Sequence, residues 1–459
     1  MIKSVRLRFI GFSRAREVFM SKIKVALISL GCPKNLVNSE QMLYLMNEAG
    51  MELVPEPEDA DTVVINTCGF IESAKTEAID TIIEMGELKK AGKLKSIVAA
   101  GCLVQRYKDE ISKELPELDA MLGTGSYGDI VEAVKVSLKG KPFEKFGDID
   151  EAVEETGRIV STGPSWAYLR IAEGCNNRCA FCVIPSIRGK YRSRKMEDIV
   201  DEARALAKTG TKELIVVAQD ITRYGTDLYG KRLLPELLHK LCAIKGVEWI
   251  RLHYLYPDEF DDELIGTIIS EKKILKYIDI PIQHINDGIL KRMYRRGTGN
   301  EVRELLRKLR EKIPGVVIRT SLIVGLPGEG EAEFNELCAF LREAKIERAG
   351  VFVFSPEEGT PAAAMTDRCD EDEAKRRQEI VMEIQTEIME AWSRSFIGKT
   401  VRVLCEGYDE EQGLQFGRSF ADSPDIDGIV FFSGECAAGE FAEVEITETA
   451  EGEWFGREV

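Results

Sequence analysis

Cysteines are the residues of this sequence best suited to hold a metal, since it has eleven of them and only three histidines. The strongest pattern lies in the segment EGCNNRCAFCVIP, where Cys175, Cys179 and Cys182 have the spacing CX3CX2C. Three thiolates can bind three irons of a cubane [4Fe–4S] cluster. The fourth iron is then open to chelate the amino and carboxylate groups of S-adenosylmethionine (SAM). A zinc knuckle is the alternative, but it needs a fourth Cys or His in tetrahedral spacing, and the sequence offers none nearby.

Cys32, Cys68 and Cys102 form a second set, because each follows an apolar run that we expect to be a strand. The three runs are KVALISLG, DTVVINT and SIVAAG. Loops at the carboxyl ends of parallel strands share one edge of a sheet, so the three thiols would converge. A single cysteine after a strand is usually a small buried hydrophobe. Three in succession, two of them as Gly-Cys, predict a second cluster site.

The other five cysteines show no ligand spacing: Cys242, Cys338, Cys369, Cys405 and Cys436. Cys242 and Cys338 fall in expected helices and are interpreted as packing residues. No export signal accompanies this cysteine set, which argues against a disulfide scaffold and for a reducing, cytoplasmic location. The chain also has no apolar run of about 18 residues, so we expect no membrane span. Residues 1–21 are interpreted as a disordered extension, with Met20 as a plausible start.

Alternation of short apolar runs and amphipathic segments over residues 22–146 predicts a parallel, Rossmann-like α/β sheet with helices on both faces. GTGSYG at 123–128 formally fits GxGxxG, but it lacks the acidic residue expected about 20 positions later. We interpret it as a strand-to-helix turn and assign no dinucleotide. The acidic stretch at 147–157 is a candidate linker.

Residues 160–395 carry a second, longer series of strands and helices, which predicts a partial TIM-type (β/α) barrel. The expected strands are AYLRIA, ELIVVA, WIRLHY, YIDIPI, VVIRTSLIV and GVFVFS. From residue 396 to 459 short strands with glycines predict a small β-barrel. From Ile397 onward, four basic residues stand against fifteen acidic ones, a net charge of −11 out of −17 for the whole chain.

Polar residues recur at or near the ends of the predicted barrel strands, where barrel enzymes place their chemistry. Any one of them could be a structural polar group, but their shared placement predicts cofactor contacts. The predicted SAM-binding residues are Gln219, Arg251, His253, Gln283, Arg319, Thr320, Gly325 and Glu329, with Asp220 and His284 beside them.

The segments GCPKNLVNSE, NTCGFIESA, EGCNNRCAFCVIPSIRG, YRSR, LPGE and SPEEGTPAA together resemble the radical SAM methylthiotransferases. The resemblance covers the chain from about residue 22 and implies three modules, the last a TRAM domain of OB-like barrel type. GCPKN, VVAQDITRYG and GRSFADSPDIDG are similar to the RimO branch, which modifies a ribosomal protein, rather than to the MiaB-type tRNA branch. Asn38 stands where relatives often carry Asp, and we expect no effect of this on the chemistry.

The resemblance implies two 4Fe–4S clusters: one on Cys175, Cys179 and Cys182 that cleaves SAM, and an auxiliary one on Cys32, Cys68 and Cys102 that carries the sulfur. It implies methylthiolation of the β-carbon of an aspartate in a basic small-subunit ribosomal protein. The partners are that protein and an electron donor such as a flavodoxin or ferredoxin, with nucleic acid involved only through the ribosome. No catalytic residue is predicted beyond the cluster ligands.

Three rival functions remain open at this stage. The first is the same chemistry on a tRNA adenosine, which a TRAM domain of net charge −11 disfavours because phosphate contacts need Lys and Arg. The second is a non-catalytic iron–sulfur protein. The third is a radical SAM enzyme whose auxiliary cluster only relays electrons, which would form no carbon–sulfur bond.

Overall fold

The computed structural model describes residues 8–10 and 22–459. These divide into two compact units, which are described separately. The first unit is the chain to residue 162 with residues 172–176 and 182–205, and the second is residues 163–171, 177–181 and 206–459. Among the described residues, no helix combines the length and apolarity that crossing a membrane requires.

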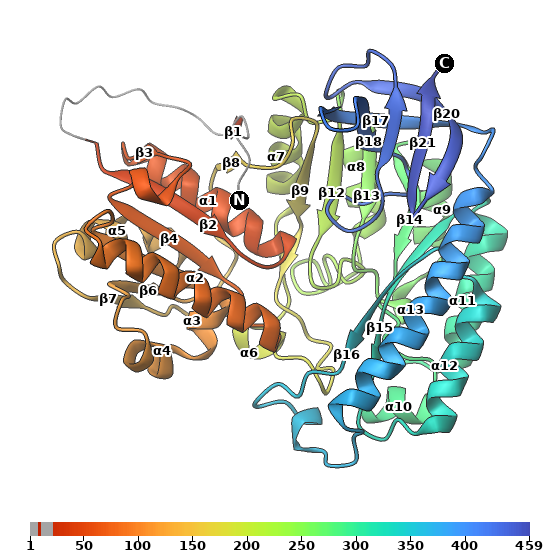
Figure 1. Ribbon diagram of the computed structural model, residues 1–459, viewed down its shortest axis with the longest axis horizontal. Helices are drawn as coiled ribbons and strands as arrows, with labels where there is room; N and C mark the ends of the chain where they lie inside the picture. Colours follow the sequence, from red (N-terminus) through yellow and green to blue (C-terminus); the bar gives the residue numbers. More distant parts are fainter. Residues whose placement is uncertain (1–7, 11–21) are drawn as a thin grey trace. The chain divides into compact units, whose positions relative to one another are not determined.

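A six-stranded parallel sheet forms the centre of the first unit, in the order β3-β2-β4-β5-β6-β7 (Figure 1). Its strands are β2 (Lys24–Ser29), β3 (Glu52–Leu53), β4 (Thr62–Thr67), β5 (Ser96–Gly101), β6 (Ala120–Leu122) and β7 (Phe143–Lys145). The Rossmann-like sheet predicted from strand–helix alternation is therefore confirmed. GTGSYG forms the turn between β6 and the next helix, as expected, and residues 146–157 contain no helix or strand.

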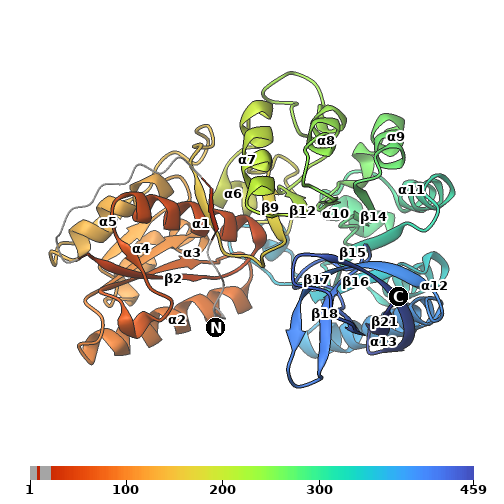
Figure 2. The same ribbon diagram turned by 90° about the horizontal axis from the view of Figure 1, so that it is seen from above.

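Helices cover both faces of this sheet, and consecutive strand residues supply the two faces in turn. Val25 and Val64 pack in one apolar cluster with α1 and α5, whereas Ala26 and Val63 pack in another with α2, α3 and α4. Figure 2 shows α1 and α2 on opposite sides of the sheet. The helices are α1 (Pro33–Glu48), α2 (Glu72–Lys90), α3 (Cys102–Arg106), α4 (Lys108–Glu114) and α5 (Ile130–Ser137), with short 3-10 turns at Pro57–Asp59 and Tyr127–Asp129.

Smaller elements complete the first unit. Strand β1 (Arg8–Ile10) pairs antiparallel with β8 (Arg158–Val160). These three residues are therefore ordered in a strand, whereas the sequence predicts a disordered extension over 1–21. Their backbone groups pair with β8, a strand far along the chain, and the composition of residues 1–21 does not reveal this partner. The rest of that extension lies outside the described residues. The remaining elements are β10 (Ala172–Glu173), β11 (Arg192–Ser193), α6 (Ile184–Arg188) and α7 (Met196–Lys208), whose last residues belong to the second unit.

The second unit contains a six-stranded parallel sheet in the order β16-β15-β14-β13-β12-β9, which confirms the predicted partial barrel (Figure 1). Its strands are β9 (Trp166–Arg170), β12 (Glu213–Val217), β13 (Trp249–Leu252), β14 (Ile274–Asp279), β15 (Val317–Val324) and β16 (Arg348–Val353). Its helices are α8 (Leu234–Cys242), α9 (Asp262–Ser270), α10 (Asp287–Arg292), α11 (Gly299–Lys312), α12 (Glu331–Ala344) and α13 (Glu371–Arg394), with 3-10 turns at Pro257–Glu259 and Ala362–Ala364.

Side-chain caps fix where several of these helices begin. Asp261 accepts a hydrogen bond from the backbone N–H of Leu264 at the start of α9, and Asp370 does the same for α13. Thr298 and Glu301 form a reciprocal capping box at α11. Each cap satisfies backbone donors that the first helical turn leaves unpaired.

The carboxyl-terminal residues form a closed five-stranded barrel in the order β17-β18-β19-β21-β20, as predicted. The strands are β17 (Thr400–Asp409), β18 (Leu414–Arg418), β19 (Val430–Ser433), β20 (Phe441–Ala450) and β21 (Glu453–Glu458). This barrel packs on the amino-terminal ends of the parallel strands, because Trp249, Leu275 and Val317 share an apolar cluster with its core.

Buried charges join this small barrel to the parallel sheet. Glu213, the first residue of β12, is fully buried and pairs with Arg251 of β13 and with Arg418 of β18, each at 2.7 Å. Burial alone would raise the pKa of Glu213, but the two guanidiniums outweigh it and hold that pKa below its ordinary value. Arg348 and Asp422 form a second buried pair across the same junction, at 2.6 Å. The small barrel is therefore fixed to the sheet by paired charges as well as by apolar contact.

We expect Arg418→Met to lower the free energy of unfolding of the carboxyl-terminal barrel by about 3–5 kcal/mol, because it removes one partner of a buried ion pair. Urea titration followed by tryptophan fluorescence would report the change, since Trp454 lies in the barrel core. Arg457→Met is the matched control, because its pair with Glu445 is largely exposed and should contribute at most about 1 kcal/mol. Equal losses for the two variants would contradict the assignment.

Candidate functional site

The second cysteine set lies where three neighbouring strands of the first unit end. Cys32 follows β2 and is the N-cap residue of α1, Cys68 follows β4, and Cys102 begins α3 directly after β5. In the sheet β2 pairs with β4 and β4 with β5, so the three cysteines share one edge. Parallel strands thus bring together residues that are 34 to 70 positions apart in the chain.

Two glycines allow the loops at this edge to approach one another. Gly31 has φ +86°, and a Cβ added there would lie 2.9 Å from the Cys68 sulfur. A Cβ on Gly69 would lie 2.7 Å from the Cα of Leu103, so the loop after β4 passes directly against the start of α3. These contacts are closer than any larger residue permits. The glycines beside Cys32 and Cys68 therefore serve the convergence of the set.

The three thiols influence one another's ionisation. Burial raises the pKa of Cys68 to about 11, and the neighbouring Cys102 and Cys32 add to the rise. Burial also raises the pKa of Cys102, against the opposing charge of Arg188. At Cys32 burial is outweighed by the charges of Lys34 and Arg188 and by backbone N–H groups, so its pKa is lowered. Three mutually interacting thiols beside two cations fit an anionic thiolate-bound group.

In the part of the chain that the structure describes, no three His, Cys, Asp or Glu side chains converge closely enough to hold a single metal ion. In a cubane cluster each cysteine binds a different iron, so its ligands are spread around the cluster rather than gathered on one point. The spread of Cys32, Cys68 and Cys102 over three strand ends is compatible with that arrangement.

Cys175, Cys179 and Cys182 lie in the loop between β10 and α6, and all three are half-buried. Cys175 and Cys182 belong to the first unit, where the backbone N–H of Cys175 donates to the carbonyl of Gly189 at 3.1 Å. Cys179 belongs to the second unit. The spacing itself keeps the three cysteines within eight consecutive residues, whichever unit holds them.

Sequence reasoning missed two residues that contact Cys179. The Cys179 sulfur lies 3.7 Å from the Tyr256 hydroxyl and 3.6 Å from Nη1 of Arg295. The Arg295 guanidinium also stacks on the Tyr256 ring, 4.2 Å from its centroid. Arg295 comes from RMYRRG, one of several arginine-rich segments, and nothing in the sequence distinguishes it from its neighbours.

Three of the predicted SAM-binding residues lie at the carboxyl edge of the parallel sheet. Gln219 follows β12, Gln283 follows β14, and Gly325 follows β15. Gln283 has φ +72°, held by a bridge of its backbone to Leu322. Gly325 has φ +75°, and a Cβ there would lie 2.8 Å from the Ala374 side chain. This edge is where chemistry is expected in barrel enzymes.

Two further predicted residues, Arg319 and Thr320, connect β15 to β14 and to the residues that follow it through polar contacts. Arg319 pairs with Asp279 at 2.9 Å. The buried Thr320 hydroxyl donates to the carbonyl of Ile280 at 2.7 Å and accepts from the N–H of Ile282 at 3.1 Å. Both side chains thus form hydrogen bonds within the sheet.

Glu329 stabilises the turn after β15. It is buried, pairs with Arg377 at 2.8 Å, lies 3.3 Å from Nε2 of His284, and accepts a hydrogen bond from the N–H of Gly325 at 2.9 Å. Its contact to the predicted SAM edge is therefore made through the backbone of Gly325.

Arg251 and His253 face the carboxyl-terminal barrel. Nη1 of Arg251 donates to the carbonyl of Phe420 at 2.8 Å, in addition to its pair with Glu213. Nε2 of His253 lies 3.0 Å from the Ser423 hydroxyl. These two side chains join the two barrels of the second unit, although the backbone of His253 directly follows β13 and so lies at the carboxyl end of that strand.

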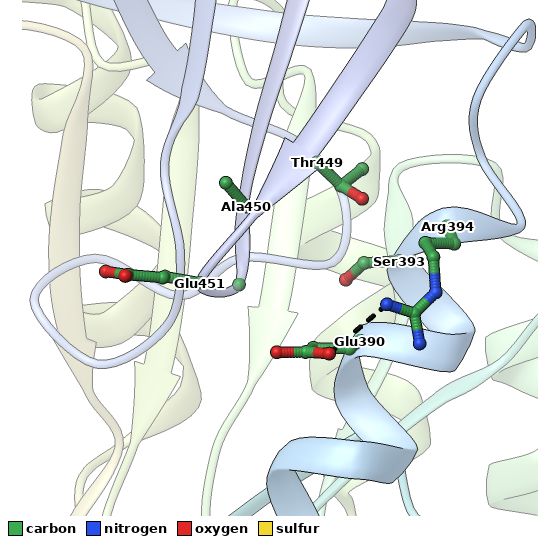
Figure 3. A pocket seen from close by; sticks show the side chains of 7 residues that line it. Glu390, Ser393, Arg394, Thr449, Ala450 and Glu451 are labelled. Carbon is green, nitrogen blue, oxygen red and sulfur yellow. Dashed lines mark hydrogen bonds and ion pairs between the residues drawn. The ribbon is translucent and has the colours of Figure 1, made fainter.

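A pocket elsewhere in the second unit lies between α13 and the turn joining β20 to β21 (Figure 3). Glu390, Ser393 and Arg394 of the helix face residues 449–452, and Glu390 pairs with Arg394 at 3.2 Å. No cysteine and no predicted SAM residue lines it. It is therefore separate from the candidate site.

Comparison with known proteins agrees with this three-part organisation. Residues 24–123 match the uncharacterized protein family UPF0004, residues 169–341 match the radical SAM superfamily, and residues 397–459 match the TRAM domain. The chain is 49% identical to the ribosomal protein uS12 methylthiotransferase RimO of Lachnoclostridium phytofermentans, over 95% of this chain and 99% of that protein. The chain belongs to the RimO family. The RimO protein of Clostridium acetobutylicum is 46% identical over 95% of this chain and 98% of its own length.

Among solved structures, the fold resembles the radical SAM methyltransferase TsrM of Kitasatospora setae, determined with cobalamin and a [4Fe–4S] cluster bound. The TM-score is 0.54 over 75% of this chain and 77% of that one, at 13% sequence identity. This likeness supports the fold alone. Within the RimO family, the closed five-stranded barrel of this chain corresponds to the TRAM domain and the partial barrel to the radical SAM domain.

Proposed function

We propose that this chain methylthiolates the β-carbon of an aspartate in the small-subunit ribosomal protein uS12 by radical SAM chemistry. The observation that carries the proposal is its 46–49% identity, over about 95% of its length, to proteins named as uS12 methylthiotransferases. Identity of this extent spans all three domains, so the substrate-binding part is included along with the chemistry.

The proposal assigns two clusters to this chain. Cys175, Cys179 and Cys182 would hold the one that binds SAM, and Cys32, Cys68 and Cys102 would hold the auxiliary one. When bound, these groups supply reductive cleavage of SAM to a 5′-deoxyadenosyl radical and the sulfur that is transferred. Support for the auxiliary site comes from three thiols at adjacent strand ends and from the glycines that let them approach.

The predicted SAM residues divide into three roles under this proposal. Gln219, Gln283 and Gly325 would contact SAM directly, because they lie at the carboxyl edge of the sheet. Arg319, Thr320 and Glu329 would position that edge through hydrogen bonds within it. Arg251 and His253 would act at the TRAM junction, where their polar atoms find partners.

Charge supports a basic protein as the substrate. The TRAM domain has a net charge of −11, and a strongly acidic surface attracts a cationic partner while it repels phosphates. We propose that uS12 docks through this charge, that nucleic acid is reached only through the ribosome, and that the reaction takes place in the cytoplasm. The electron donor would be a small reductant such as a flavodoxin or ferredoxin.

The proposal is tested by an anaerobic reaction of the reconstituted chain with SAM, a strong reductant, and either uS12 or total tRNA. We expect the target aspartate to gain about 46 Da, the mass of SCH3 replacing hydrogen, as read by peptide mass spectrometry. Methylthioadenosine in digested tRNA with unmodified uS12 would overturn the substrate. SAM cleavage without a carbon–sulfur bond in either sample would mean that the auxiliary cluster only relays electrons.

A further inference from the structure

We infer that Arg188 is a positioning residue for the auxiliary cluster: its buried guanidinium contacts the Cys102 sulfur, and the neutral side chain of Asn38 leaves its charge directed at the cluster ligands. This inference rests on the proposed function, because it concerns the cluster that Cys32, Cys68 and Cys102 would hold.

Arg188 is the last residue of α6 and is only 2% exposed. Its Nη2 lies 3.4 Å from the Cys102 sulfur and 3.1 Å from Oδ1 of Asn35. Its Nη1 donates to Glu173 at 2.9 Å and to Oδ1 of Asn38 at 3.2 Å. All of these residues belong to the first unit. The guanidinium therefore reaches the predicted cluster ligands from a helix that follows the CX3CX2C loop.

The partners of this guanidinium are divided between a carboxylate, two amides and a sulfur. A buried cation is ordinarily neutralised by carboxylates, and Arg188 has one, Glu173. Its other two oxygen partners, on Asn35 and Asn38, are neutral amides. Glu173 binds Nη1, whereas Nη2 faces the Cys102 sulfur and the neutral amide of Asn35, so no carboxylate stands between this nitrogen and the ligand sulfur.

The side chain at position 38 determines how much negative charge surrounds the Arg188 guanidinium. The sequence comparison predicts no effect of Asn38 on the chemistry, but the structure places its amide oxygen within hydrogen-bond distance of Arg188. A carboxylate at this position would compete with the sulfur for the same guanidinium. Hydrogen bonds to ligand sulfurs and the net charge nearby set the reduction potential of an iron–sulfur cluster. Nearby positive charge favours the reduced, more negative state, so Arg188 should raise the potential of the auxiliary cluster.

Arg188 could instead be a purely structural clamp between α6 and α1, and Asn38→Asp separates the two roles. The substitution preserves side-chain size and would strengthen a clamp. If Arg188 acts on the cluster, the added negative charge must lower the potential. Asn47→Asp is the matched control, because it adds the same charge to the same helix, nine residues closer to its carboxyl end.

The experiment uses the full chain with Cys175, Cys179 and Cys182 all replaced by Ala, so that only the auxiliary cluster contributes to the signal. After anaerobic reconstitution, a redox titration is followed by electron paramagnetic resonance. We expect Asn38→Asp to lower the midpoint potential, so that the reduced-to-oxidised ratio at the unsubstituted midpoint falls at least about tenfold. Arg188→Met should lower the potential too and release iron, Arg188→Lys should restore part of the shift, and Asn47→Asp should leave the potential unchanged.

Unchanged potentials in both Asn38→Asp and Arg188→Met, with the cluster present, would overturn the role of Arg188 and leave the proposed function intact. An equal shift in Asn47→Asp would overturn it as well, because the effect would then not be specific to the guanidinium. Absence of any cluster in the triple-alanine background would overturn the auxiliary site itself, and with it this part of the proposed function.

Discussion

Cys179→Ala is expected to reduce SAM cleavage to background and to leave about half of the iron, because one of the two proposed clusters loses a ligand while the other is untouched. Chromatography of 5′-deoxyadenosine after addition of dithionite measures the cleavage, and a colorimetric assay measures the iron. The effect should be all-or-none, since no acid or base side chain can generate the radical in place of the cluster.

Cys242→Ala is the matched control for this experiment, because Cys242 is a buried packing residue of α8 without ligand spacing. It should retain both the iron and the cleavage activity. If Cys179→Ala retained its cleavage activity, the CX3CX2C assignment would be wrong.

Cys68→Ala is expected to have the opposite pattern: SAM is still cleaved, but no methylthio group reaches uS12. Cys68 lies against Gly31 at the shared strand edge, and its loss removes one of three ligands there. Loss of an outer-shell partner at a metal site already costs about 10- to 100-fold, so loss of a ligand should exceed that range. Parallel assays of 5′-deoxyadenosine and of the about 46 Da product separate the two steps.

Cys436→Ala provides the control in this case, since Cys436 is a half-buried cysteine of the TRAM domain. It should perform both steps. Should Cys68→Ala lose SAM cleavage together with product formation, the two cysteine sets would not be independent, and either misfolding or a shared site would replace the two-site interpretation.

Much of the fold and the cysteine edge could be predicted because both depend on local pattern. Short apolar runs such as residues 62–67 and 96–101, which alternate with longer amphipathic segments, favour buried parallel strands, and a residue directly after each strand must lie at the carboxyl edge. Parallel topology then brings Cys32, Cys68 and Cys102 to one edge without any knowledge of side-chain contacts.

The polar contacts could not be predicted, because they depend on partners far apart in the chain. Arg251 finds the carbonyl of Phe420 169 residues away, and Arg188 finds Cys102 86 residues earlier. A charged residue in a strand pattern looks the same whether it faces a cofactor or another domain. Only the packing of the two barrels distinguishes Arg251, at the TRAM junction, from Gln283, at the carboxyl edge.

The paired charges of Glu213 with Arg251 and Arg418 have a consequence for how a bound protein substrate can reach the carboxyl edge of the sheet. They fix the acidic TRAM barrel to the amino-terminal ends of the parallel strands, whereas Gln219, Gln283 and Gly325 lie at the carboxyl ends. Ser423 of the same barrel nevertheless contacts His253, which directly follows β13, so one TRAM loop extends to the carboxyl end of that strand. Under the proposed docking on the TRAM domain, uS12 must extend its aspartate from the barrel towards the carboxyl ends of the strands, so the length of the extended segment limits which residue can be modified.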